Sequence, residues 1–86
     1  MDANLAKDVY IRDGWKCRNC KSRNNLMAHH VVFRSHQGPD ALNNLLTLCS
    51  SCHRGLHDGK LELLVITTTE TDLTVKFSII GNWKPC

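Results

Sequence analysis

The sequence predicts a small α+β fold of one domain spanning residues 1–86. Three observations support this: a helical apolar stripe near the N-terminus, a strand-loop-strand-helix pattern in the middle, and an alternating pattern near the C-terminus. The chain has only 86 residues, and a hydrophobic core of that size gives modest stability by itself. We therefore expect a disulfide or a metal ion to reinforce the fold.

The first predicted element is a short amphipathic helix over residues 3–12. Leu5 and Val9 share one stripe, and Asp2 or Asn4 is available as the N-cap. Gly14 is a suitable residue for ending the helix. We expect Tyr10 to be a packing residue, as we do Trp15.

The middle of the chain predicts two strands and a helix. Residues 26–32 are apolar and end in β-branched side chains, and residues 45–48 form a second apolar run. The intervening polar loop contains Gly38-Pro39, which is typical of irregular connections. A helix should begin at Ser51 or Cys52 and end at Gly59.

A β-hairpin is predicted from about residue 61 to 80. Apolar residues alternate with polar ones on both sides of a connection at 67–72. We expect this hairpin to pack against the rest of the fold and to carry no chemistry. The alternating residues are Leu61, Leu63, Val65, Leu73, Val75, Phe77 and Ile79.

Two Cys-x-x-Cys pairs predict a metal site. They are Cys17/Cys20 and Cys49/Cys52, and a two-residue spacing lets a tight turn aim both sulfurs at one ion. Four thiolates form a closed shell with no open position, so the predicted zinc ion is structural. The alternatives are two disulfides or a redox pair. Cys86 is assigned no role.

The N-terminus and the charge distribution suggest a location and a partner. No basic run followed by an apolar core begins the chain, and no apolar run is long enough for a bilayer, which favours a cytoplasmic protein with no membrane partner. The formal net charge is +3. Basic residues outnumber acidic ones before residue 35, so this half could face phosphates, although an ordinary solvated surface would look the same.

Four histidines predict a second centre, in which three could bind a metal ion and the fourth has another role. His53 and His57 lie four residues apart on the predicted helix, so both imidazoles can reach one ion. His29 on the strand would complete a three-imidazole site, which leaves positions open for water or a phosphate oxygen. Because successive strand residues point to opposite faces, His30 must point elsewhere. It is the candidate general base, and Asn44 could hold the loop that aims it.

These residues resemble the HNH nuclease motif of the ββα-metal fold, and the cysteine pairs are similar to those of small phage and bacterial HNH endonucleases. The resemblance covers about residues 9–59. It implies a ββα-metal core with a zinc-stapled N-terminal helix and a C-terminal β-hairpin. It also implies metal binding by His29 and His53, a general base at His30 and an orienting role for Asn44. His57 matches the third metal histidine of the nuclease colicins.

Three further charged residues lie close in sequence to these histidines. Arg34 occupies a loop position where relatives often carry Arg-Ser, and its guanidinium could hold a phosphate, although a solvated arginine is an equal alternative. Asp40 is expected to cap or brace the loop rather than bind metal. Arg54 follows a predicted ligand on the helix and could contact a backbone phosphate.

The function that follows is a metal-dependent endonuclease that hydrolyses DNA phosphodiesters by nicking or double-strand cleavage. Its catalytic divalent metal would be Mn²⁺, Ni²⁺, Mg²⁺ or Zn²⁺, and imidazole ligands favour Mn²⁺ or Ni²⁺ over Mg²⁺. The alternative is a catalytically inactive, zinc-stapled DNA-binding or assembly module of a phage packaging or restriction system. DNA is the expected partner in both cases. A specificity-conferring protein is a further candidate partner, and the chain could act as a monomer or a dimer.

Overall fold

The computed structural model describes residues 3–32 and 38–84 and confirms the small α+β class. No helix in these two ranges has the length and apolar character needed to cross a bilayer. The elements, in chain order, are α1 (Ala3–Arg12), β1 (Leu26–His30), the 3-10 helix η2 (Leu42–Asn44), β2 (Leu45–Cys49), α2 (Ser50–His57), β3 (Leu61–Thr68) and β4 (Leu73–Ile79).

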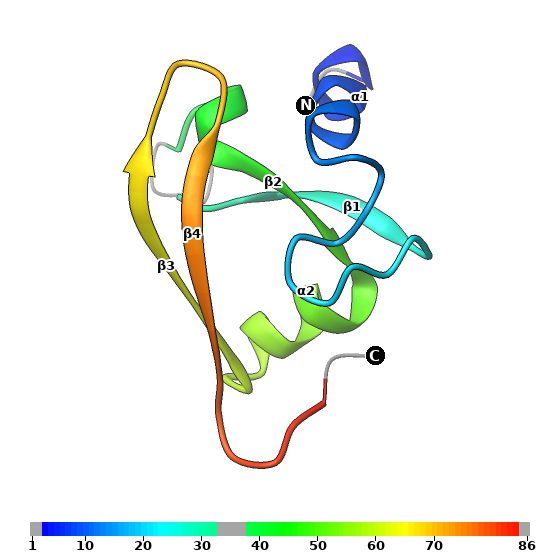
Figure 1. Ribbon diagram of the computed structural model, residues 1–86, viewed down its shortest axis with the longest axis vertical. Coiled ribbons are helices and arrows are strands. Elements are labelled where there is room, and N and C mark those ends of the chain that lie inside the picture. The colour runs from blue at the N-terminus through cyan, green and yellow to red at the C-terminus, as the bar shows by residue number, and fades with distance from the viewer. Residues whose placement is uncertain (1–2, 33–37, 85–86) are drawn as a thin grey trace.

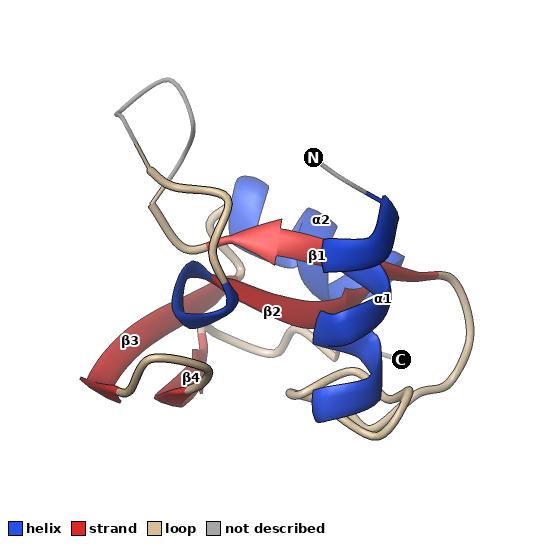
Figure 2. Ribbon diagram, turned by 90° about the horizontal axis from the view of Figure 1, so that it is seen from above, coloured by secondary structure: helices blue, strands red, loops and turns tan. Residues whose placement is uncertain are grey.

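The two strands of the middle region pair as predicted. β1 and β2 are antiparallel, with Leu26 opposite Cys49 and His30 opposite Leu45. Helices α1 and α2 lie on different sides of this pair (Figure 1), and Figure 2 shows the same arrangement from above. Every residue of β2 is buried, so β2 is the centre of the fold.

The N-terminal segment covers the second edge of β2. The Thr47 backbone N–H donates to Asp13 Oδ2 at 2.9 Å, and the Arg18 N–H donates to the Thr47 carbonyl oxygen at 2.9 Å. Val9 of α1 is fully buried, as predicted. Because strand edges with unpaired polar groups invite aggregation, this cover also protects the sheet.

Helix α1 ends as its sequence indicates. Gly14 has a φ of 72°, a left-handed conformation that costs glycine little. The rings of Tyr10 and Trp15 lie 5.3 Å apart, so the predicted packing residues contact each other. Trp15 nevertheless remains 46% exposed.

A partly buried arginine network joins the N-terminal segment to the hairpin, a contact that no sequence pattern predicted. Arg12 donates to the carbonyl oxygens of Leu42 and Leu45 at 2.6 and 2.7 Å. Arg18 donates to Asp72 Oδ1 at 3.0 Å and to the Leu73 carbonyl oxygen at 2.8 Å. These bonds satisfy backbone acceptors where α1, η2 and β4 meet.

The C-terminal hairpin forms as predicted, except that β3 continues through Thr68 into the expected connection. An irregularity in register lies between Val65 and Thr67. Leu61 and Leu73 are buried in the core cluster, whereas the outward-facing Leu64 and Ile66 are 62% and 57% exposed. The hairpin stands beside the β1–β2 pair (Figure 1).

The C-terminal segment returns to helix α2. A Cβ atom placed on Gly55 would lie 2.5 Å from a ring carbon of Trp83. Such a distance is a clash, so the indole requires glycine at position 55. Trp83 is partly buried and packs against the core cluster.

Candidate functional site

The four cysteines of the two Cys-x-x-Cys pairs converge. Their sulfur atoms all lie within 4.8 Å of one another, and the sulfurs of Cys20 and Cys49 are 3.5 Å apart. In a tetrahedral zinc-thiolate site with Zn–S bonds of about 2.3 Å, neighbouring sulfurs are separated by about 3.8 Å. The cluster therefore has the size and donor set to bind a structural metal such as zinc.

Local backbone structure brings each pair into place. A turn joins the Cys17 N–H to the Ser22 carbonyl oxygen at 2.8 Å and the Lys21 N–H to the Cys17 carbonyl oxygen at 3.0 Å. Cys49 ends β2 and caps α2, its sulfur accepting from the Cys52 N–H at 3.5 Å. One pair thus lies in a turn and the other at a strand-to-helix junction.

The electrostatics of the cluster favour a bound cation. Burial raises the pKa of the Cys52 thiol to about 12, although the Asn19 side chain donates to its sulfur at 3.4 Å and opposes that shift. Burial also raises the pKa of Cys17, but backbone hydrogen bonds from Cys20, Cys49 and Asn19 outweigh it and lower the value overall. Several adjacent buried thiolates are stable only when a cation compensates their charge.

Three histidines, one from β1 and two from α2, gather near one another. The ring centroids of His29 and His53 are 5.3 Å apart, and those of His53 and His57 are 4.6 Å apart. The Nε2 atoms of His53 and His57 approach to 3.3 Å. The two helix histidines therefore lie beside the strand histidine.

Burial keeps His29 neutral. Its pKa falls from 6.5 to about 4, because burial disfavours the imidazolium and the neighbouring histidines add repulsion. Burial lowers the pKa of His53 as well, and His57 adds to that effect. A neutral imidazole is the form that ligates metal. Within the described parts of the chain, however, only the four cysteines have their ligand atoms grouped closely enough to hold an ion as they stand.

His30, the next residue of β1, contacts a partner outside this group. Its Nε2 atom lies 2.6 Å from Asp40 Oδ1. The side chain of His30 is 15% exposed and that of Asp40 is 32% exposed. Asp40 thus contacts the candidate general base, where the sequence analysis expected only a loop brace.

Asn44 closes the loop between β1 and η2. Its Oδ1 accepts from the Val32 N–H at 2.9 Å, and its Nδ2 donates to the carbonyl oxygens of Val32 and Pro39 at 3.0 and 2.9 Å. Asn44 is 6% exposed. These bonds hold together the two ends of the loop, whose residues 33–37, including the candidate phosphate ligand Arg34, lie outside the described residues.

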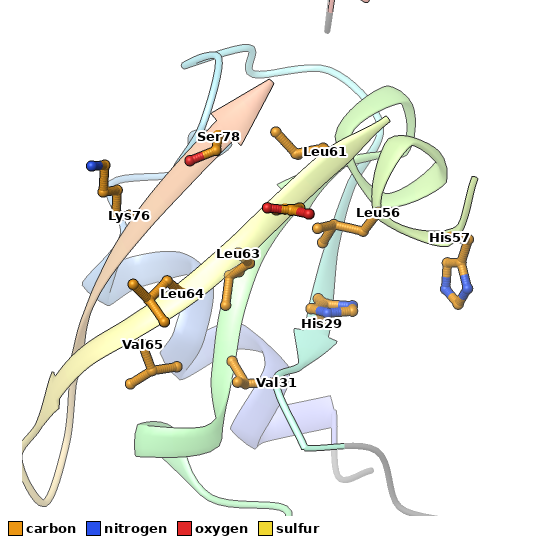
Figure 3. A pocket seen from close by; sticks show the side chains of 11 residues that line it. His29, Val31, Leu56, His57, Leu61, Leu63, Leu64, Val65, Lys76 and Ser78 are labelled. Carbon is orange, nitrogen blue, oxygen red and sulfur yellow. The ribbon is translucent and has the colours of Figure 1, made fainter. Parts of the chain in front are cut away.

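A groove of about 540 Å³ opens beside the imidazoles. Figure 3 shows His29 and His57 at one end, with Leu64 and Val65 of β3 toward the other. Lys76 and Ser78 of β4 also line it. The hairpin, predicted to carry no chemistry, therefore forms a wall next to the candidate site. No sequence signal in the hairpin's alternating pattern indicated this position.

Comparisons with known proteins match the part of the chain that contains these residues. The model of the family described as HNH endonuclease matches residues 17–59, half of the chain. That range includes both cysteine pairs and every histidine. The chain is also similar to Anaredoxin from Nostoc sp. strain PCC 7120, with 33% identity over 58 residues, covering 66% of this chain and 76% of that protein. No solved structure matched.

Proposed function

Because this chain belongs to the HNH endonuclease family, we propose that it is a metal-dependent endonuclease that hydrolyses DNA phosphodiester bonds. One observation carries the proposal. Three imidazoles gather, with ring centroids 5.3 Å apart for His29 and His53 and 4.6 Å apart for His53 and His57, while the adjacent His30 contacts Asp40. Metal ligation and proton transfer are thus divided between neighbouring residues.

We assign the two metal sites as follows. Cys17, Cys20, Cys49 and Cys52 bind a structural zinc ion, which their mutual distances support. His29, His53 and His57 bind a catalytic divalent ion, either Mn²⁺, Ni²⁺, Mg²⁺ or Zn²⁺. When bound there, the ion neutralises charge that develops on the scissile phosphate and leaving oxygen.

The protein side chains perform the remaining steps. His30 takes a proton from the attacking water, for which a neutral imidazole is suited near pH 7. Asn44 keeps the loop ends in place through its three backbone hydrogen bonds. Arg34, in the part of the chain that is not described, is proposed from the sequence alone to hold a phosphate oxygen.

The basic surface that could meet DNA is smaller than the sequence suggested. Arg12 forms an ion pair with Asp13, and Arg18 forms ion pairs with Asp13 and Asp72. The exposed Lys7, Lys21 and Arg23 remain better placed for phosphates. We further propose a location in the cytoplasm of a bacterial or phage-infected cell, with sequence specificity supplied by another protein or by a dimer.

The test is cleavage of supercoiled plasmid by the purified, zinc-loaded protein in the presence of Mn²⁺, Ni²⁺, Mg²⁺ or Zn²⁺. We expect nicking, with Mn²⁺ or Ni²⁺ more effective than Mg²⁺. His30→Ala should lower kcat by about 10²- to 10⁴-fold without changing metal affinity. His53→Ala should weaken metal binding at the histidines.

A matched control is His36→Ala: the sequence gives this fifth histidine no counterpart in the HNH motif, and it lies outside the described residues. The activity of this variant should equal that of the wild type. Absence of nicking in every metal, or full activity of His30→Ala, would contradict the proposal. DNA binding with a steep salt dependence but no cleavage would instead identify the catalytically inactive binding or assembly module.

A further inference from the structure

We propose that Asp40 is a positioning residue for His30: its carboxylate holds the imidazole through Nε2 and leaves Nδ1 as the atom that accepts the proton from water. This inference rests on the proposed function for its catalytic consequence. The hydrogen bond itself can be measured without activity.

The first step concerns the contact between the two side chains. His30 Nε2 and Asp40 Oδ1 are separated by 2.6 Å, a short distance for a hydrogen bond between a ring nitrogen and a carboxylate oxygen. An ionised carboxylate can only accept hydrogen bonds. The proton of a neutral His30 ring must therefore lie on Nε2, and the lone pair must lie on Nδ1.

The second step concerns what holds Asp40 in place. Asn44 donates to the carbonyl oxygen of Pro39, the residue immediately before Asp40, and exchanges two hydrogen bonds with Val32, two residues after His30. The buried amide of Asn44 therefore fixes both backbone segments that carry the interacting side chains. Asp40 converts this backbone arrangement into a fixed orientation of the ring.

The third step concerns why a ring at this position needs a partner. His30 is the last residue of β1, where it lies opposite Leu45 of β2. This strand pairing involves the backbone and does not fix the imidazole ring. A neutral imidazole can carry its proton on either nitrogen, and the hydrogen bond made by one nitrogen decides the state of the other. A general base must also lie within hydrogen-bond reach of its proton. The Asp40 carboxylate meets the first requirement by fixing the tautomer, and it serves the second by restraining the ring.

The experiment combines spectroscopy with a double-mutant cycle on the full zinc-loaded chain. In ¹⁵N-labelled protein we expect a low-field N–H resonance assigned to His30 Nε2. Asp40→Ala should remove that resonance, lower kcat tenfold or more and leave KM and the affinity for Ni²⁺ unchanged. In a His30→Ala background, Asp40→Ala should cause no further loss, because its effect passes through the missing ring.

Asp8→Asn is the matched control, because Asp8 is an exposed acidic residue on α1. It should retain both the resonance and the activity. If Asp40→Ala proves unfolded, Asp40→Asn keeps the side-chain size, and its kcat should fall between those of the wild type and Asp40→Ala.

Three results would overturn the inference: an unchanged His30 resonance, an additional loss of activity in the His30→Ala background, or weaker Ni²⁺ binding, which would make Asp40 a metal ligand. Failure of the wild type to cleave DNA would contradict the proposed function instead. In that case the resonance still decides whether Asp40 holds the ring.

Discussion

The sulfur cluster and the histidine cluster differ in how completely the protein builds them. Four sulfurs lie within 4.8 Å of one another, and Cys17, Cys49 and Cys52 are buried. The histidines are looser: His29 is buried, His53 is half-buried and His57 is exposed. A closed, compact shell suits an ion that supports the fold, whereas an open and partly exposed shell leaves room for substrate.

Helix α2 is the element that the two clusters share. Cys52 and His53 are consecutive residues of this helix, and consecutive helical side chains point about 100° apart around the axis. One helix can therefore serve a buried sulfur centre on one side and an open imidazole centre on another. The position of His53 consequently depends on the sulfur centre.

The largest expected effect is the loss of the structural ion. Cys52→Ser should abolish cooperative folding, because structural zinc contributes about 10–16 kcal/mol in zinc-finger peptides, as much as the whole stability of a small domain. Circular dichroism and elemental analysis would check this outcome. Ser51 is an exposed residue between Cys49 and Cys52, and the control variant Ser51→Ala should fold and bind zinc normally. A native-like spectrum for Cys52→Ser would refute the structural role of the ion.

A smaller effect is expected on the histidine side of the comparison, from Asn44→Ala. This change removes three backbone hydrogen bonds from a buried amide, and we expect a loss of about 2–4 kcal/mol in urea unfolding. Zinc content should not change. Asn43→Ala is the matched control, because Asn43 makes an exposed bond to the Thr69 carbonyl oxygen. Equal losses from the two variants would argue against a special role for Asn44.

The smallest expected effect is a loss of stability at low pH that comes from the histidine cluster. Burial lowers the pKa of His29 from 6.5 to about 4, so the unfolded chain binds a proton in this interval and the folded chain does not. Stability without metal at the histidines is therefore full above pH 6.5 and falls as the pH decreases toward 4. The total loss from His29 should be about 3 kcal/mol at most.

Urea unfolding of zinc-loaded protein at several pH values would measure this loss. Acid also weakens the sulfur centre, so the comparison must be made with His29→Gln. The variant should show a shallower decline between pH 6.5 and 4. If the two proteins decline in parallel, protonation of His29 does not contribute.

The sequence predicted those features that depend on local spacing. The helical stripe around Val9, the two strands and the two cysteine pairs each follow from intervals of two to four residues, and the structure contains all of them. Strand alternation likewise predicts that His29 and His30 point in opposite directions, and the structure gives them different partners, His53 and Asp40. For this reason the fold class and the sulfur cluster were predictable without coordinates.

Contacts between distant segments were not predictable in this way. The bond from Arg18 to Asp72 spans 54 residues, and the Cys-x-x-Cys pair that contains Arg18 specifies no partner for its arginine. The contact between His30 and Asp40 crosses a loop whose path no periodicity describes. The groove wall formed by the hairpin depends on how β3 packs beside β1, which an alternating apolar pattern does not specify.

The glycine beneath Trp83 makes helix α2 intrinsically weak. The helix has only eight residues, isolated helices shorter than about 12–15 residues are marginal in water, and an interior glycine costs about 1 kcal/mol relative to alanine. Its helicity must therefore be imposed from outside, by the cap at Cys49, by the indole and by any ion held at Cys52. The helical far-ultraviolet ellipticity of the protein should consequently decrease when these tertiary supports of α2 are removed.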